Sequence, residues 1–115
     1  HQLSLFFEYF EINISKKDKK PDEIVTSFLN EITKDVIVND QMLVKAGEDN
    51  FLFSFYSIEN NEGIQFKNHI WYRIRVKDSK ILIVSFVFSY KLKTKIIAEV
   101  YYNKIYELIK SCELN

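Results

Sequence analysis

Four residues with alternating spacing form the strongest candidate for a binding site in the sequence: Trp71, Arg73, Arg75 and Lys77. Residues two apart on a strand share a face, so these side chains are predicted to face solvent or a partner. An aromatic ring beside guanidinium groups can stack on bases, bind carboxylates or anchor a protein partner. In that case Arg73→Ala and Arg75→Ala should weaken binding and leave the melting temperature nearly unchanged. The structural alternative places Trp71 under a helix, with the arginine stems covering apolar surface.

The other residues that could do chemistry are isolated in the sequence. Gly47 and Gly63 stand alone, so the Rossmann and Walker phosphate-loop patterns are absent. His1 and His69 cannot form a metal-binding pair one helical turn apart, and His69 is predicted to be a polar strand residue near a turn rather than a ligand or proton shuttle. Cys112 falls on an apolar helical stripe and is interpreted as a small buried residue. We therefore expect no enzymatic activity, no metal and no cofactor.

A long antiparallel hairpin must position the four candidate residues. Two runs of alternating apolar residues within Ile64–Tyr90 flank the polar turn Lys77–Lys80. The return strand, residues 81–90, is apolar on both faces, which predicts a central place in the sheet. The side chains expected to face the core from the first strand are Ile70, Tyr72, Ile74 and Val76.

The N-terminal half is predicted to contain a strand, a charged loop and a helix. Residues Leu3–Ile14 carry apolar side chains on both faces, which predicts a strand buried on both sides for part of its length. The lysines that follow, between Lys16 and Lys20, alternate with acids and are interpreted as a solvated loop rather than a nucleic-acid site. Pro21 then suits the first turn of an amphipathic helix that ends near Lys34.

The remaining patterns predict further strands and a second helix. Residues Val36–Ala46 suggest two short strand pieces around Asn39-Asp40, and Phe51–Ile58 an aromatic strand. Turns are expected at residues 47–50 and 60–63, where Asn and Gly tolerate positive φ. A helix is predicted from about Thr94, with Tyr102 and Tyr106 beside its buried stripe. The residues of that stripe are Ile97, Val100, Tyr101, Ile105, Leu108 and Cys112.

Together these elements predict a single α+β domain over residues 1–115. The element order β-α-β-β-β-β-α favours a mainly antiparallel sheet of about five or six strands packed with two helices. The two helices are expected to cover the same sheet or opposite ends of it. A chain of 115 residues with 47% hydrophobic residues can build one core without a metal or disulfide.

Charge and hydropathy restrict the classes of partner. Lys plus Arg and Asp plus Glu number 16 each, so no net charge attracts nucleic acid or an anionic membrane. No apolar run reaches the roughly 18–20 residues that span a bilayer. The first residue is His1 rather than Met, which suits either a tag remnant or a trimmed export signal. The compartment and the oligomeric state are left open.

The C-terminal half resembles the PsbP-like superfamily of small α-β-α sandwich domains. The resemblance covers roughly Ile64–Leu114 and rests on the hairpin WYRIRVKDSKILIVSFVFSY, the helix IIAEVYYNKIYELIKS and the close Ser111-Cys112-Glu113-Leu114. In that family, such a close often turns back as a short strand. The resemblance implies a non-enzymatic binding or scaffold domain that acts through sheet edges and helix faces, and we expect a bacterial source.

The leading hypothesis is a protein-binding or adaptor domain that acts through a sheet or helix face. One alternative is an immunity protein that neutralises a toxin by occluding its active site. The other is a carrier of a small molecule or lipid, with an aromatic-lined cavity that a fully packed core would exclude. The residues expected to line that cavity are Phe51, Phe53, Phe55, Phe86 and Phe88.

Overall fold

The structure is a computed structural model that describes residues 3–14 and 20–112. Its elements follow the predicted order β-α-β-β-β-β-α, with one 3₁₀ turn before the last helix, and the predicted α+β class is confirmed. The charged segment 15–19 and the expected strand-like close after Cys112 lie outside the described residues. The elements are β1 (Leu3–Asn13), α1 (Pro21–Thr33), β2 (Asn39–Lys45), β3 (Asn50–Asn61), β4 (Ile64–Lys77), β5 (Lys80–Lys91), η1 (Leu92–Thr94) and α2 (Lys95–Ser111).

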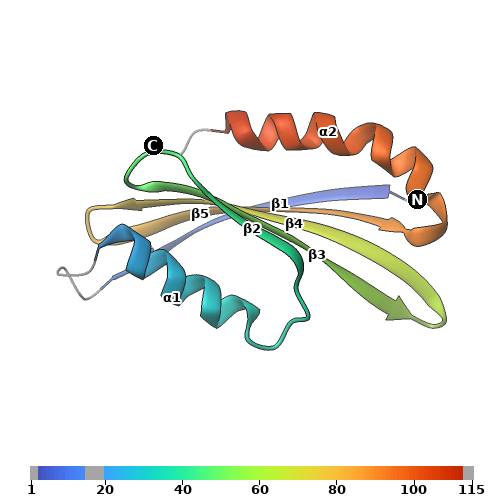
Figure 1. Ribbon diagram of the computed structural model, residues 1–115, viewed down its shortest axis with the longest axis horizontal. Helices are drawn as coiled ribbons and strands as arrows, with labels where there is room; N and C mark the ends of the chain where they lie inside the picture. Colours follow the sequence, from blue (N-terminus) through green and yellow to red (C-terminus); the bar gives the residue numbers. More distant parts are fainter. Residues whose placement is uncertain (1–2, 15–19, 113–115) are drawn as a thin grey trace.

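Five strands form one antiparallel sheet in the order β1-β5-β4-β3-β2. The two helices lie on opposite faces of this sheet, so the chain has three layers, α-β-α (Figure 1). β4 is the central strand and β5 is its neighbour, which confirms that the return strand of the hairpin is internal. Because β5 has a helix-covered layer on each side, four successive residues, Ile81–Val84, are all buried.

The face covered by α1 carries the first part of the core. Pro21 occupies the first turn of α1, where its missing N–H costs no hydrogen bond, and Asp22 and Glu23 complement the positive end of the helix dipole. The buried side of α1 presents Ile24, Val25 and Leu29 to the sheet. As predicted, alternate residues of β3 and β4 meet them. The sheet residues buried in this cluster are Phe51, Phe53, Phe55, Ile74, Val76, Ile81 and Ile83.

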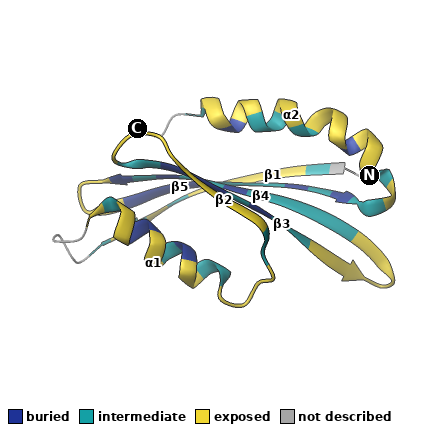
Figure 2. Cartoon of the chain, in the orientation of Figure 1, coloured by how far each residue is buried: buried dark blue, intermediate teal, exposed yellow. Residues whose placement is uncertain are grey.

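The face covered by α2 carries the second part of the core, and here the predicted helical stripe was wrong. The helix buries Ala98 and Ile109, whereas Ile97, Val100 and Leu108 are exposed (Figure 2). α2 is therefore rotated by about one residue relative to the expectation. The sheet residues that it covers are Leu52, Trp71, Phe88 and Tyr90, with Phe86, Tyr102, Ile105 and Tyr106 packed around them.

The hairpin turns follow the predicted chemistry. Glu62 and Gly63 connect β3 to β4 with φ values of 53° and 82°. Two consecutive left-handed residues match the right-handed twist of the flanking strands. Between β4 and β5 a single residue, Asp78, is left-handed, with φ 55°.

The two edges of the sheet differ from the expectation. β1 is an edge strand, so the predicted burial on both faces is wrong: Phe7 is 75% exposed. β2 forms the other edge as one strand rather than two pieces, and its register shifts between Asn39 and Met42. Asp40 lies within this shift with φ 49°, which gives a bulge in place of a break.

Candidate functional site

The four residues of the predicted Trp71 face do not form a shared exposed surface. Trp71 is 1% exposed and packs beneath α2, so the expectation that it faces solvent or a partner is wrong. Its ring lies 5.6 Å from the Tyr102 ring of the helix and 5.9 Å from the imidazole of His69. The indole is a core group, as the structural alternative requires.

The cations beside Trp71 divide between internal contacts and solvent. Arg73 is half-buried, and its Nη2 donates a hydrogen bond to the carbonyl oxygen of Cys112 at 2.8 Å. A guanidinium at this place complements the negative end of the α2 dipole and ties the helix to the sheet. Arg75 Nε lies 3.5 Å from a carboxylate oxygen of Asp49, and Lys77 is exposed at the end of β4. Binding of a partner by these cations stays a prediction.

Aromatic rings surround His69 in the middle of β4. Its imidazole is 4.6 Å from the Tyr102 ring and nearly parallel to the rings of Trp71 and Phe88. Its Nε2 shares a 3.1 Å hydrogen bond with the hydroxyl of Tyr90. A small hollow of about 140 Å³ opens beside it. The residues lining this hollow are Asp40, Ser54, Phe55, Tyr56, Lys67, His69, Trp71 and Tyr102.

The electrostatics of this cluster favour a neutral imidazole. Burial, and to a lesser extent the charge of Lys67, lowers the pKa of His69 to about 4. Burial likewise raises the pKa of Tyr90 and of Tyr102. Within the described ranges, no group of three His, Cys, Asp or Glu side chains could hold a metal ion. The cluster is thus a hydrogen-bonded aromatic core in which His69 supplies the polar group.

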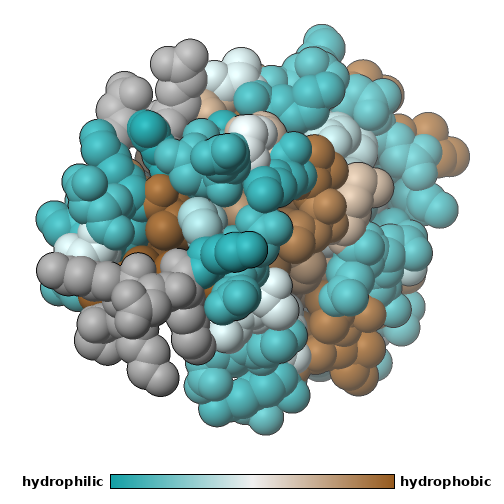
Figure 3. Space-filling model, turned by 60° about the vertical axis from the view of Figure 1, so that its left-hand side comes forward, coloured by the Kyte–Doolittle hydropathy of each residue, from teal (hydrophilic) through white to brown (hydrophobic). Residues whose placement is uncertain are grey.

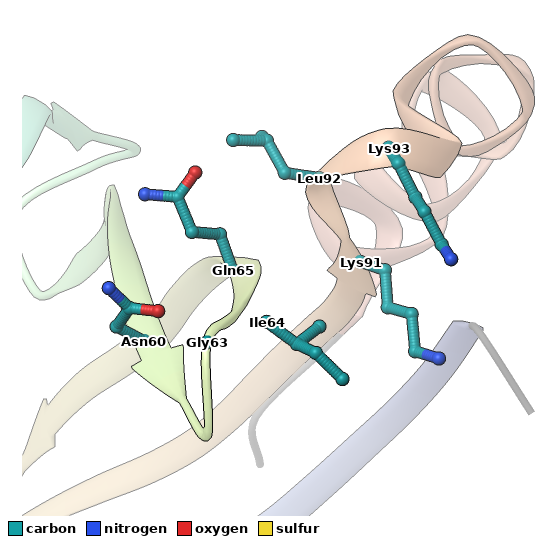
Figure 4. A pocket seen from close by; sticks show the side chains of 7 residues that line it. All are labelled: Asn60, Gly63, Ile64, Gln65, Lys91, Leu92 and Lys93. Atoms are coloured by element: carbon teal, nitrogen blue, oxygen red, sulfur yellow. The ribbon is translucent and has the colours of Figure 1, made fainter.

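A larger and more open hollow lies at the end of the β4–β5 hairpin that is away from its turn. It has a volume of about 620 Å³ and lies between the β3–β4 turn and the junction of β5 with η1 (Figure 4). The ammonium groups of Lys91 and Lys93 extend away from the amides of Asn60 and Gln65. Because its polar groups diverge, this hollow does not present a converging set of contacts to a ligand.

The predicted aromatic cavity of a carrier is contradicted by the sheet topology. Phe51, Phe53 and Phe55 point to the α1 face and are buried there. Phe88 lies in the cluster on the α2 face, and Phe86 packs against it. The sheet itself separates the two groups, so the five phenylalanines cannot line one cavity.

The most distinctive surface of the molecule lies where β1 and α2 expose apolar side chains. Apolar side chains reach the surface between polar ones in several places (Figure 3). On β1, Leu5, Phe7 and Tyr9 share the α2 face, because their cross-strand partners Phe88, Phe86 and Val84 point that way. We call the β1–α2 surface the set Leu5, Phe7 and Tyr9 of β1 with Ile97, Tyr101 and Leu108 of α2. Their exposed fractions are 47%, 75%, 51%, 58%, 47% and 68%, respectively.

The two parts of the β1–α2 surface face the same side. Tyr102 of α2 leans toward β4, where it meets His69 and Trp71. Successive helical residues are about 100° apart, so Tyr101 and Ile97 lie on the opposite flank, toward β5 and β1. On the sheet, the Phe7 ring is 6.5 Å from that of Phe86, which packs against the cluster under α2. The β1 residues therefore continue the apolar surface of the α2 cluster outward to the edge of the sheet.

Sequence reasoning missed this surface because it assigned the same residues to the core. Ile97, Tyr101 and Leu108 were expected in the buried helical stripe, and Tyr102 and Tyr106 beside it; the two sets are exchanged in the structure. One signal was available. α2 has more apolar residues than a single stripe needs, and a helix that is apolar around most of its surface has a second face to cover.

Comparison with known proteins gives a fold and no family. No family model and no curated protein sequence matches the chain. The structure is similar to that of LpqN, a protein involved in cell envelope biogenesis of Mycobacterium tuberculosis, with a TM-score of 0.63. The match has 7% sequence identity and covers 88% of this chain and 58% of the LpqN chain, so this chain spans little more than half of that protein. Among the described residues, no helix combines the length and apolar character needed to cross a membrane. The chain thus shares its fold with LpqN.

Proposed function

We propose that this chain is a protein-binding domain that acts through the β1–α2 surface. The observation that carries the proposal is the exposure of three large apolar side chains on an edge strand, on the face covered by α2, and of three more on the flank of α2 that is turned away from Tyr102. Contiguous exposed apolar surface on a soluble domain typically marks an interaction site. Aromatic residues such as Phe7, Tyr9 and Tyr101 are enriched in such sites because they bury much area at low entropic cost.

The fold supports the proposal at a coarser level. The α-β-α layering is the arrangement that the resemblance to the PsbP-like superfamily implies, and membership of that superfamily is part of the proposal. A binding role through a sheet edge and a helix face is the role expected of such domains. Neutralisation of a toxin would be one use of the same surface, and it stays a prediction.

The test is capture of a protein partner by matched baits. Wild-type chain, the double variant Phe7→Ser/Leu108→Ser and the control Ile37→Ser are immobilised and exposed to a lysate of the native host, with mass spectrometry of bound proteins. Ile37 is 83% exposed and lies between α1 and β2, so the control removes an apolar group outside the β1–α2 surface. Each captured protein is then purified and titrated against the three baits by calorimetry.

We expect the purified partner to bind wild type and Ile37→Ser equally and the double variant about tenfold or more weakly, because truncating two central apolar contacts typically removes over 1 kcal/mol. Equal affinity for all three baits would contradict the proposal. Circular dichroism of each bait establishes that the variants are folded.

A further inference from the structure

The two edge strands differ in how far they could accept another strand. β2 has 7 residues, and the register shift at its start distorts its pairing. Short length and a bulge are devices that protect an edge from further pairing. β1 has 11 residues in unbroken register with β5, and neither Pro nor Lys interrupts it. β1 carries two charged residues, Glu8 and Glu11, but lacks the short length and the bulge that protect β2.

Among the described strands β1 pairs with β5 alone, and its outward backbone groups include those of Leu5, Phe7 and Tyr9. The amide of Ile14 donates to Ser79 at 2.7 Å, which continues the β1–β5 register by one residue. Along an antiparallel strand, alternate residues direct their N–H and C=O groups toward the neighbouring strand, and the residues between them direct these groups to the other side. Counting back from Ile14 by two, the even-numbered residues bond to β5, so the amides and carbonyls of the odd-numbered Leu5, Phe7 and Tyr9 point away from β5. The exposed side chains of these three residues and their outward backbone groups therefore lie along the same edge of the sheet.

We propose that the partner on the β1–α2 surface is a second copy of this chain, joined by antiparallel pairing of the two β1 strands about a twofold axis at Phe7. The inference rests on the proposed function, since it names the occupant of that surface. In this register Phe7 pairs with its own symmetry mate, Leu5 with Tyr9 and Phe6 with Glu8. Every hydrogen-bonded pair then joins two residues whose backbone groups point outward.

Charge and paired length favour this register over the two neighbouring registers. An axis at Glu8 would bring two carboxylates directly opposite each other, which is destabilising. An axis at Phe6 would shorten the paired segment. With the axis at Phe7, pairing runs from Leu3 to Glu11 of each strand, and no acid faces an acid. Such an interface is isologous, as expected of a twofold dimer.

The same arrangement completes the helix layer. A twofold axis perpendicular to the extended sheet leaves the α2 helices of both copies on one face. The pairing of Leu5 with Tyr9 then extends the exposed apolar row of β1 into the second copy on that same face. Apolar side chains of both β1 strands would leave water together.

Cysteine crosslinking tests the register directly, in a Cys112→Ser background that removes the native thiol. In a hydrogen-bonded antiparallel pair the Cα atoms are about 5.5 Å apart, which a disulfide can bridge. Phe7→Cys should form a covalent dimer under mild oxidation. Leu5→Cys alone should not, but an equimolar mixture of Leu5→Cys and Tyr9→Cys should. Intact mass and a non-reducing gel report the products.

Sedimentation equilibrium gives the independent measurement. We expect wild type to dimerise with rising concentration, Ile37→Ser to do the same, and Phe7→Lys to remain monomeric with an unchanged circular dichroism spectrum. A monomeric wild type, a dimer that tolerates Phe7→Lys, or crosslinking of Leu5→Cys alone would overturn the inference. A monomer that still captures another protein through the β1–α2 surface would leave the proposed function standing, so the two failures are distinguishable.

Discussion

The two flanks of α2 show how one helix can close one part of a sheet and leave another open. On the flank toward β3 and β4, Tyr102 and Tyr106 pack with Trp71 and His69. On the flank turned away from Tyr102, Ile97 and Tyr101 remain exposed, as does Phe7 on β1. Both flanks are rich in large apolar side chains, so hydrophobicity alone does not distinguish them. The difference lies in the width of the sheet: α2 covers the middle strands, and β1 extends beyond its reach.

The largest difference in the free energy of unfolding is expected between truncating Trp71, which the closed flank covers, and truncating Leu108 on the open flank. Trp71→Ala removes a fully buried indole and should lower the free energy of unfolding by about 3–5 kcal/mol. Leu108→Ala removes an exposed side chain and should change it by less than about 0.5 kcal/mol. Urea unfolding at low protein concentration, with the slope compared between variants, checks both values. Similar losses for the two variants would abolish the distinction between a closed and an open flank.

The C-terminal end of α2 gives a second, smaller effect. Arg73→Ala removes the charge-assisted hydrogen bond to Cys112 and should cost about 1–2 kcal/mol. This differs from the expectation drawn from the sequence, in which loss of Arg73 would leave the melting temperature nearly unchanged. Faster hydrogen exchange in the last turn of α2 would identify the cause, and Arg73→Lys, which keeps the charge, should recover part of the loss. Unchanged exchange in the alanine variant would show that the contact does not hold the helix.

The neutral imidazole of the closed flank makes stability depend on pH. An unfolded histidine takes up a proton near pH 6.5, whereas His69 in the folded chain does so at about pH 4. Between these values the unfolded state binds more protons, so acidification destabilises the fold, and below about pH 4 this contribution stops growing. With allowance for its partial exposure, we expect a loss of about 1–2 kcal/mol.

The measurement is thermal unfolding of wild type and His69→Phe from pH 8 to pH 4, because the variant keeps an aromatic ring and lacks the titrating group. The difference between the two melting temperatures should change between about pH 6.5 and pH 4 and be flat above that window. A constant difference across the whole range would refute the role of His69. Acids such as Glu11 titrate in both proteins and cancel in the comparison.

Much of the fold could be predicted from the sequence because local chemistry specifies it. Alternation in β3, β4 and β5 correctly assigned Phe51, Phe53 and Phe55 to one face, and Gly63 and Asp78 marked the hairpin turns. The element order and the α+β class followed from these local patterns. The burial of Trp71 could not be predicted in this way, because the alternating pattern around it is the same whether or not a helix covers that face.

What the sequence determined by itself is which residues are apolar and with what period they recur, because side-chain type and backbone geometry are local properties. Only the tertiary structure decided that β1 lies at an edge and that α2 turns Ala98 and Ile109 inward. Strand order depends on pairing between segments far apart in the chain. The rotation of α2 depends on how its small and large side chains fit the sheet beneath. These two non-local choices leave Phe7 and Tyr101 exposed at the surface.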